Sequence, residues 1–261
     1  MASQPPRTHP EPATVPTVVD EWERRLELEG CLNFRDLGGY AAKQGRRVRR
    51  RAVFRSDALH HITRHDVAQL RELGLGDIID LRSTAELRTE GRGPLVHEPV
   101  RFHHVPLFDG EPQGDRGTSL SLGERYFLLA ELAKGPIARV ITILADTTAV
   151  AVYHCAAGKD RTGVVTALLL GLLEVDDETI AADYALTQQA LDAIIERLNE
   201  SDGYQTMLAT LPPETLHARP DTMREFLDRL RARYGSVAGY VTDAGVEADT
   251  VIRIRERLLE R

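Results

Sequence analysis

Residues 154–163 (HCAAGKDRTG) combine the groups that phosphoryl chemistry needs. The segment follows a short apolar run, residues 149–154, that predicts a buried strand. It leads into residues 161–173, which are apolar on nearly every side and predict a core helix. A loop that ends on a helix N-terminus aims several backbone N–H groups into one concavity, and the helix dipole adds positive potential. We therefore expect this loop to bind a dianionic phosphoryl group.

Cys155 is the nucleophile that the loop offers. Donors that bind a phosphoryl group also stabilise a thiolate, so we expect its sulfur to be ionised at neutral pH. Five residues separate Cys155 from Arg161, a spacing that returns the guanidinium to the bound anion, where its planar fork grips two oxygens. Gly158 removes a Cβ where the backbone approaches the phosphate, and the Thr162 hydroxyl is expected to donate to the sulfur. The residues expected to bind phosphate are Ala156, Ala157, Gly158, Lys159 and Thr162.

A buried, inert core cysteine is the common alternative for Cys155. The histidine before it, the glycine inside the loop and the Thr-Gly pair after it favour the functional interpretation. The segment is not a Walker A loop, because its Gly-Lys pair is followed by Asp. We expect His154 to orient the loop through backbone hydrogen bonds, and Asn33, Arg35 and Asp36 to be architectural.

The loop resembles the phosphate loop of the protein-tyrosine-phosphatase superfamily. Its Lys-Asp pair, with residues 33–39 (NFRDLGG), 54–57 (FRSD), 79–83 (IDLRS) and 234–241 (YGSVAGYV), is similar to one bacterial branch. That branch contains mycobacterial tyrosine phosphatase B and related tyrosine and phosphoinositide phosphatases. The resemblance extends over about residues 30–261 and implies a cysteine-phosphatase-like fold with hydrolysis through a cysteinyl-phosphate.

The leaving group needs a proton, which a carboxylic acid near the phosphate supplies. In the branch resembled here the Asp inside the loop is the proposed acid, which corresponds to Asp160. The cations Lys159 and Arg161 flank it and favour its ionised form, so a salt-bridged structural carboxylate is the alternative. Asp80, near the C-terminal end of a predicted strand, is the second catalytic candidate. Asp109, in the loop after the next strand, is the third.

Lys159 bears on the substrate, which we expect to be a phosphorylated protein or a phosphoinositide. Similar loop lysines occur in phosphoinositide phosphatases, whose substrates carry several phosphates, so we expect Lys159 to contact substrate; a solvated lysine is the alternative. The resemblance departs from the branch between residues 105–109 (VPLFD) and 124–132 (ERYFLLAEL). The intervening segment is short for the helical lid of the mycobacterial enzyme, so we expect no lid or only a remnant.

The elements around the loop predict an α/β fold. Strands at 52–57, 77–83, 101–107 and 149–154 alternate with helices at 63–73, 122–133, 136–145 and 161–173, a pattern typical of a mostly parallel sheet flanked by helices. Residues after 175 predict a helical C-terminal extension. The Pro-rich residues 1–17 predict a disordered tail. We expect residues 18–261 to form a single domain with a sheet core at about 31–175.

Composition narrows the class of protein further. A net charge of −7 argues against general nucleic-acid binding. No apolar run is long enough to span a membrane, and the N-terminus has no secretory h-region. The two cysteines, Cys31 and Cys155, form neither a disulfide framework nor a metal site, so we expect no cofactor and a reducing, cytoplasmic location. Secretion without a cleaved signal and the oligomeric state stay open.

Two rival functions share the loop. A non-hydrolytic phosphate-binding module would keep the cradle without a working acid, but retention of both Cys155 and Arg161 argues against it. A sulfurtransferase has no need of a phosphate-gripping arginine, and an arsenate reductase would need resolving cysteines where only Cys31 is present. The sequence therefore predicts a phosphate-monoester hydrolase.

Overall fold

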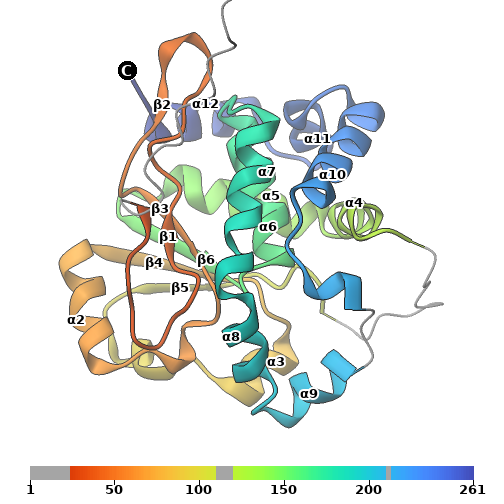
Figure 1. Ribbon diagram of the computed structural model, residues 1–261. Coiled ribbons are helices and arrows are strands. Elements are labelled where there is room, and N and C mark those ends of the chain that lie inside the picture. The colour runs from red at the N-terminus through yellow and green to blue at the C-terminus, as the bar shows by residue number, and fades with distance from the viewer. Residues whose placement is uncertain (1–23, 110–119, 210–212) are drawn as a thin grey trace, which may run out of the picture.

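A five-stranded sheet forms the centre of the protein in the computed structural model, which describes residues 24–109, 120–209 and 213–261 (Figure 1). The strand order is β1-β3-β6-β4-β5. Every neighbouring pair is parallel except β1 with β3, so the mostly parallel sheet that the sequence predicted is confirmed. The strands are β1 (Arg35–Asp36), β3 (Val53–Ser56), β4 (Leu75–Asp80), β5 (Arg101–His104) and β6 (Val150–His154).

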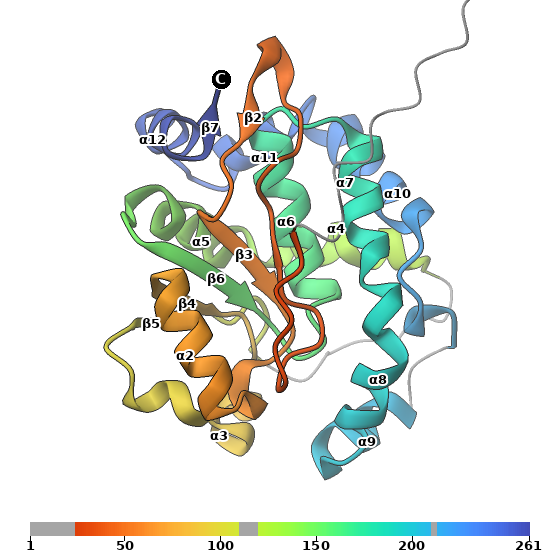
Figure 2. The ribbon, with the colours of Figure 1, turned by 60° about the vertical axis from the view of Figure 1, so that its left-hand side comes forward.

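Helices follow each parallel strand and cover the sheet (Figures 1 and 2). The α-helices are α2 (Arg64–Leu73), α3 (Thr84–Glu90), α4 (Leu122–Leu132), α5 (Lys134–Asp146), α6 (Asp160–Leu172), α7 (Asp177–Leu186), α8 (Gln188–Leu198), α9 (Asp202–Ala209), α10 (Pro220–Tyr234), α11 (Val237–Asp243) and α12 (Ala248–Leu258). Short 3-10 helices occupy η1 (Lys43–Gly45), η2 (Leu59–His61), η3 (Gly93–His97) and η4 (Pro213–Leu216). Residues 1–17, the predicted tail, and residues 110–119 lie outside the described residues.

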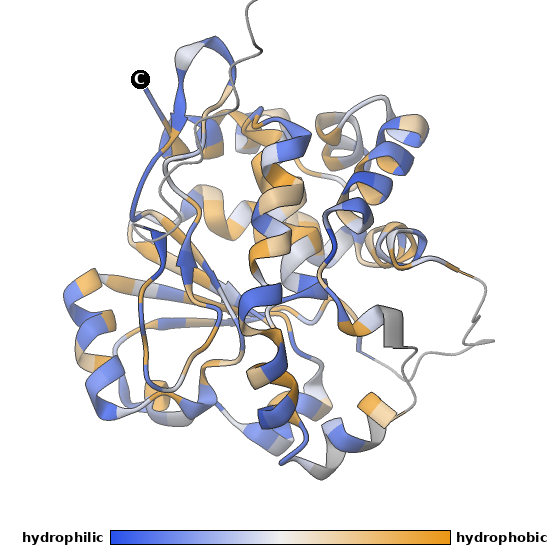
Figure 3. Ribbon diagram, in the orientation of Figure 1, coloured by the Kyte–Doolittle hydropathy of each residue, from blue (hydrophilic) through white to orange (hydrophobic). Residues whose placement is uncertain are grey.

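The two faces of the sheet are buried by different helices. Side chains alternate along a strand, so Ile78 and Val152 pack with Leu70 of α2, whereas the next residues, Ile79 and Tyr153, pack against α5 and α6 on the opposite face. Ten of the thirteen residues of α6 are buried, as its continuous apolar sequence predicted. The peripheral helices α2 and α10 combine hydrophilic and hydrophobic residues, as amphipathic helices do (Figure 3). The loop between β6 and α6 is therefore anchored on both sides by largely buried elements.

The C-terminal helices share this core. Helix α10 packs on α4 and α7, and α12 packs on α5. The chain does not end as a helix, which corrects the prediction that everything after Val175 is helical: β7 (Leu259–Glu260) pairs antiparallel with β2 (Arg47–Val48). Two residues are too few to show a strand pattern, and the pairing depends on an edge more than two hundred residues earlier in the chain. None of the helices in the described ranges is long and apolar enough to cross a membrane.

Capping boxes start α2, which the sequence predicted, and α3. Thr63 accepts from the Asp66 amide at the start of α2, and Ser83 accepts from the Glu86 amide at the start of α3. Gly74 ends α2 in the left-handed conformation, with a φ of 85°. These local hydrogen bonds fix where each helix begins and therefore which way its first-turn side chains point.

A buried charge cluster joins the sheet to α7. Asp183 of α7 binds Arg35 of β1 at 3.1 Å and Arg55 of β3 at 2.6 Å, and it accepts a hydrogen bond from Tyr40 at 2.9 Å. Arg24 lies 3.5 Å away. Burial alone would raise the pKa of Asp183, but the guanidinium groups hold it well below its usual range. The cluster therefore fixes β1 and β3 against α7 and keeps several positive charges behind the loop.

We expect Asp183→Ala to lower the free energy of unfolding by about 3–5 kcal/mol, because it leaves buried arginines without their carboxylate. Since the pKa is depressed in the folded state, this contribution is present above the ordinary pKa of an aspartate and disappears as the pH falls below it. Denaturant unfolding at neutral pH measures the loss. The control is Asp177→Ala, which breaks a partly exposed pair with Arg231 and should change stability by about 1 kcal/mol or less. Equal effects of the two substitutions would contradict this account.

Candidate active site

The loop that carries the predicted chemistry connects β6, which ends at His154, to α6, which begins at Asp160. Figure 2 shows β3 and β6 running side by side toward this end of the sheet. The first N–H groups of any α-helix lack acceptors within the helix, and no side chain caps α6. The start of α6 therefore directs free donors and the positive end of its dipole at the loop.

The carbonyl groups of the loop are bound from outside. The Ala156 carbonyl accepts from the Ala58 amide at 2.9 Å. Asn33 Nδ2 donates to the Ala157 carbonyl at 3.2 Å, and Arg55 donates to the Gly158 carbonyl at 2.7 Å. In a trans peptide the N–H points opposite to the C=O, and the described residues contain no cis peptide bond. Tethering these carbonyls outward therefore turns the amides of residues 157–159 toward the inside of the loop.

Gly158 is required by packing against β3. Its φ is 65°, a conformation that L side chains rarely adopt. A Cβ added there would lie 2.5 Å from the Ser56 carbonyl oxygen and 2.7 Å from the Asp57 nitrogen. The sequence predicted a glycine where the backbone approaches phosphate oxygens; the close approach seen here is to the neighbouring strand. Any side chain at this position would push the loop off β3.

Cys155 lies at the base of the loop and is 2% exposed. The Thr162 hydroxyl donates to its sulfur at 3.2 Å, which is the contact that the sequence predicted. The ring of His154 is also buried, with Nδ1 3.3 Å from the Cys155 carbonyl oxygen. Burial lowers the pKa of His154, so its ring is neutral at neutral pH. The sulfur thus lies buried beneath the loop, with the Thr162 hydroxyl as its donor.

Arg161 is held by Glu86, a residue that the sequence analysis did not single out. Its guanidinium makes a bidentate pair with both carboxylate oxygens of Glu86, at 2.8 Å for the Nη2–Oε1 contact. Tyr204 of α9 donates to the same carboxylate at 3.0 Å. Burial opposes the charge on Arg161, but its hydrogen bonds to Glu86 and the nearby charge of Cys155 raise its pKa above the usual value. The Ser83–Glu86 capping box marks the start of α3, but nothing in that local pattern indicates this second use of Glu86.

Asp160 lies on the rim of the loop, with 44% of its side chain exposed. Its Oδ1 accepts from the Tyr126 hydroxyl at 2.6 Å and from Lys159 Nζ at 2.7 Å. Burial by itself would raise the pKa of Asp160, but the charge of Lys159 and these hydrogen bonds lower it. A bound phosphate dianion would act in the opposite direction by disfavouring a second negative charge.

Lys159 is buried, with 5% of its side chain exposed. Besides Asp160, its ammonium donates to the Thr215 carbonyl at 2.9 Å and to the Tyr126 hydroxyl at 3.4 Å. An ammonium has three N–H donors, and these three acceptors match them in number. The solvated lysine considered from the sequence is therefore wrong, because Lys159 joins the loop to η4.

Asp80 and Asp109 lie in different surroundings from Asp160. Both oxygens of Asp80 are bound by the Arg82 guanidinium, at 3.0 and 2.6 Å, and the side chain is fully buried. Burial would raise the pKa of Asp80, but His154 and Arg82 lower it to about 2. Asp109 accepts from the Thr84 amide at 2.8 Å, so it binds the first turn of α3. Asp160 is the candidate acid that the structure brings to the start of α6.

Cys31, the other cysteine, has the opposite environment to a nucleophile. Its sulfur donates to Asp57 Oδ1 at 2.7 Å and lies 2.8 Å from the Ser56 hydroxyl. Burial and the Asp57 charge raise the pKa of Cys31 well above its usual value. A protonated thiol is a poor nucleophile, so Cys31 serves to fix Asp57 and the turn before β1.

Helices α8 and α9 cover one side of the loop. Ala156 packs with Ala190, Ile194 and Leu198 of α8 and with Tyr204 of α9. The sequence predicted no lid, or only a remnant, between residues 109 and 124, and residues 110–119 of that segment lie outside the described residues. The cover seen here comes instead from the C-terminal helices, which shape the approach to Cys155.

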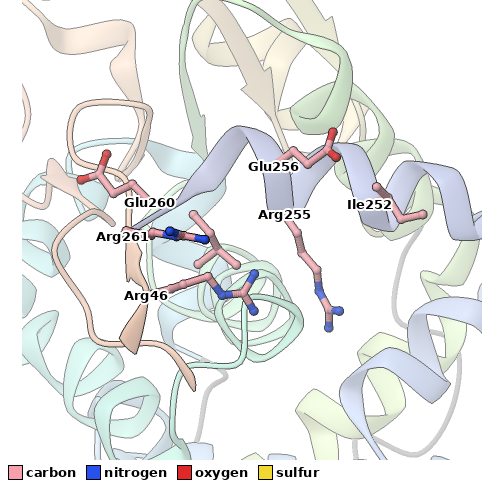
Figure 4. A pocket seen from close by; sticks show the side chains of 7 residues that line it. Arg46, Ile252, Arg255, Glu256, Glu260 and Arg261 are labelled. Atoms are coloured by element: carbon pink, nitrogen blue, oxygen red, sulfur yellow. The ribbon is translucent and has the colours of Figure 1, made fainter. Parts of the chain in front are cut away.

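A cavity of about 390 Å³ lies elsewhere, between the β2–β7 pair and α12 (Figure 4). Arg46, Arg255 and Arg261 line it beside Glu256 and Glu260. The three arginines outnumber the two glutamates, and no residue of the loop lines the cavity. Over the described ranges no group of three or more His, Cys, Asp or Glu side chains has the arrangement of a metal site.

A cysteine under inward-facing amides, next to an arginine on the first helical turn, defines a phosphate-loop enzyme that uses a cysteine. Comparison with known proteins agrees: a profile of the tyrosine phosphatase family matches residues 26–260. The chain belongs to this family, and it is a phosphate-monoester hydrolase with a cysteine-phosphatase-like α/β fold, as the sequence predicted. The sulfurtransferase and arsenate reductase alternatives receive no support.

Two relatives and one solved structure illustrate the similarity. The chain is 30% identical to the triple specificity protein phosphatase PtpB of Mycobacterium tuberculosis, over 89% of this chain and 98% of PtpB. It is 29% identical to a tyrosine-protein phosphatase of Nostoc commune, over 79% of this chain and 74% of that protein. A crystal structure of P. aeruginosa TpbA aligns with 76% of this chain and 88% of its own, at 15% identity and a TM-score of 0.38.

We expect Glu86→Gln to lower kcat/KM about 10- to 100-fold on an aryl phosphate, because the amide loses the charge-assisted bidentate pair that holds Arg161. Steady-state kinetics measure the effect. The control is Glu98→Gln, which removes a similar bidentate pair with Arg71 on the exposed side of α2 and should leave kcat/KM unchanged. Wild-type kinetics of a folded Glu86→Gln protein would show that Arg161 does not depend on this carboxylate.

Proposed function

We propose that Cys155 is the nucleophile of this phosphatase. Its thiolate attacks phosphorus in line, so that an S–P bond forms while the P–O ester bond breaks and its electron pair stays on the leaving oxygen. The inward amides and Arg161 stabilise the equatorial oxygens. Water then attacks the cysteinyl-phosphate, and the S–P electron pair returns to the sulfur as inorganic phosphate leaves. The observation that carries this proposal is the position of the Cys155 sulfur beneath the outward-tethered loop, 3.2 Å from the Thr162 hydroxyl.

Asp160 is the acid in this mechanism. It protonates the leaving oxygen in the first step and takes a proton from the attacking water in the second. Its half-exposed carboxyl on the rim supports this role. Asp80 has both oxygens bound by Arg82 and no exposed surface, so we assign it the positioning of His154 and Arg82 beneath the loop.

The substrate is a phosphorylated protein, with phosphotyrosine as the preferred residue. Cys155 lies below the surface, and an aryl group reaches deeper into a cleft than the short side chains of serine or threonine. The phosphoinositide alternative depends on a lysine that is free to bind a second phosphate. The Lys159 ammonium instead donates hydrogen bonds to Asp160, Thr215 and Tyr126, which favours the protein substrate.

We expect Cys155→Ser to reduce hydrolysis of an aryl phosphate at least about a thousandfold, because a serine hydroxyl is not ionised at neutral pH. Activity of the unchanged enzyme should be insensitive to EDTA. The matched control is Cys31→Ser, in which a hydroxyl replaces the thiol that donates to Asp57 and activity should persist. Substantial hydrolysis by Cys155→Ser, or its selective loss in a folded Cys31→Ser protein, would remove Cys155 from the mechanism.

Lys159→Ala tests the substrate class. We expect it to lower kcat/KM by similar factors, within about threefold of each other, on a phosphotyrosine peptide and on a polyphosphorylated inositol lipid, because the ammonium supports Asp160 and does not contact a second phosphate. The control is Lys134→Ala, which removes a lysine paired with Asp243 and should change neither. A loss confined to the polyphosphorylated lipid would assign Lys159 to a second phosphate and favour a phosphoinositide substrate.

A further inference from the structure

The carboxyl group of Asp160 is held on one side only. Tyr126 and Lys159 both donate to Oδ1, at 2.6 and 2.7 Å. Within the described ranges no hydrogen bond ends on Oδ2. With 44% of the side chain exposed, the two oxygens differ: one is fixed in a hydrogen-bond network and the other belongs to the open rim of the loop.

Tyr126 is itself a rigid donor. It lies on α4, is 2% exposed, and its ring packs edge-on against Tyr184 and Phe226 at centroid distances of 5.9 and 6.4 Å. Its hydroxyl lies 2.7 Å from the Tyr184 hydroxyl. Since Tyr126 gives its single proton to Asp160, its oxygen accepts from Tyr184, and a donor chain runs from α7 through α4 to the carboxyl group.

The charge of this network stays constant across the working pH range. Burial raises the pKa of Tyr126 well above its usual value and raises that of Tyr184 as well, so both hydroxyls keep their protons. Burial lowers the pKa of Lys159, but the negative charge of Asp160 more than offsets this and raises that pKa, so Lys159 stays charged. The groups that face Asp160 are therefore two neutral hydroxyls, the Lys159 ammonium and the Arg161 guanidinium.

We propose that Tyr126 is a positioning residue for the acid: its hydroxyl, supported by Tyr184, fixes Oδ1 of Asp160 so that the transferable proton is carried on Oδ2, toward the leaving group. This inference rests on the role of Asp160 in the proposed function. In this arrangement the Tyr126 hydroxyl bonds the ionised carboxylate, so its removal favours the protonated form. The pH above which the acid is lost then moves upward.

The test is Tyr126→Phe, with kcat measured against pH on a phosphotyrosine peptide. We expect kcat at the optimum to fall about tenfold, a part of the contribution of a general acid. The alkaline limb of the pH profile, where kcat falls because the acid has lost its proton, should move up by about one pH unit, as expected for one hydrogen bond to a charged group. With p-nitrophenyl phosphate, whose leaving group departs as a phenolate and needs no proton, kcat should fall much less.

Two further tyrosine variants separate positioning from packing. Tyr240→Phe removes a buried hydroxyl that donates at 2.7 Å to the Ala130 carbonyl of α4, the helix that carries Tyr126, and does not touch Asp160. This variant should leave the alkaline limb in place. Tyr184→Phe should move the limb in the same direction as Tyr126→Phe by a smaller amount. Equal behaviour of Tyr240→Phe and Tyr126→Phe, or an unmoved limb in both Tyr126→Phe and Tyr184→Phe, overturns the inference.

Asp160→Asn distinguishes failure of this inference from failure of the proposed function. If Asp160→Asn abolishes the alkaline limb while Tyr126→Phe leaves limb and kcat unchanged, Asp160 is the acid and Tyr126 does not position it. If Asp160→Asn retains the wild-type limb and kcat, Asp160 is not the acid, and both proposals fall.

Discussion

The outward tethering of the loop carbonyls is the constraint on which the active site depends. The carbonyls of residues 156–158 are bound by the Ala58 amide, Asn33 and Arg55, and the Lys159 carbonyl accepts from the Gly163 amide within α6. Each bond fixes a peptide plane, and each fixed plane directs the next N–H inward. An anion site made of backbone amides thus needs partners outside the loop as much as it needs the loop sequence.

One of these partners, Arg55, belongs to the buried charge cluster around Asp183. Arg55 bonds the loop with one nitrogen and Asp183 with another, and Arg35 and Arg24 share the same carboxylate. Three guanidinium groups and one carboxylate leave two positive charges in this cluster. In the low dielectric of the interior such charges act over longer distances than in water, so the cluster both shapes the loop and favours an anion within it.

The local parts of this arrangement were predictable from the sequence. Cys155, Arg161 and Gly158 lie within one short segment, and the flanking strand and helix follow from apolar patterns that do not depend on the rest of the chain. The capping boxes at Thr63 and Ser83 are equally local. The five residues between Cys155 and Arg161, with a strand before them and a helix after them, therefore predict the class of enzyme without any tertiary contact.

The partners of the loop were not predictable, because they come from distant parts of the chain. Glu86 lies 75 residues before Arg161, and Tyr126 lies 34 residues before Asp160. Their types are common in helices, and only the packing of α3 and α4 against the loop brings them into contact. Lys159 was expected at the substrate, yet its environment is decided by a carbonyl of η4, 56 residues later. Side chains in a loop can be assigned a chemistry from sequence, but their direction depends on tertiary packing.

The central claim is that the amides after Cys155 and the Arg161 guanidinium together hold the oxygens of a phosphoryl group above the sulfur. A crystal structure of the protein with bound orthovanadate tests it most directly. The account predicts vanadium bonded to the Cys155 sulfur, with its oxygens within hydrogen-bond distance of the inward N–H groups of residues 157–159 and of the Arg161 guanidinium. Vanadate bound at Cys31, or bound near Cys155 with those amides turned away from its oxygens, would contradict it.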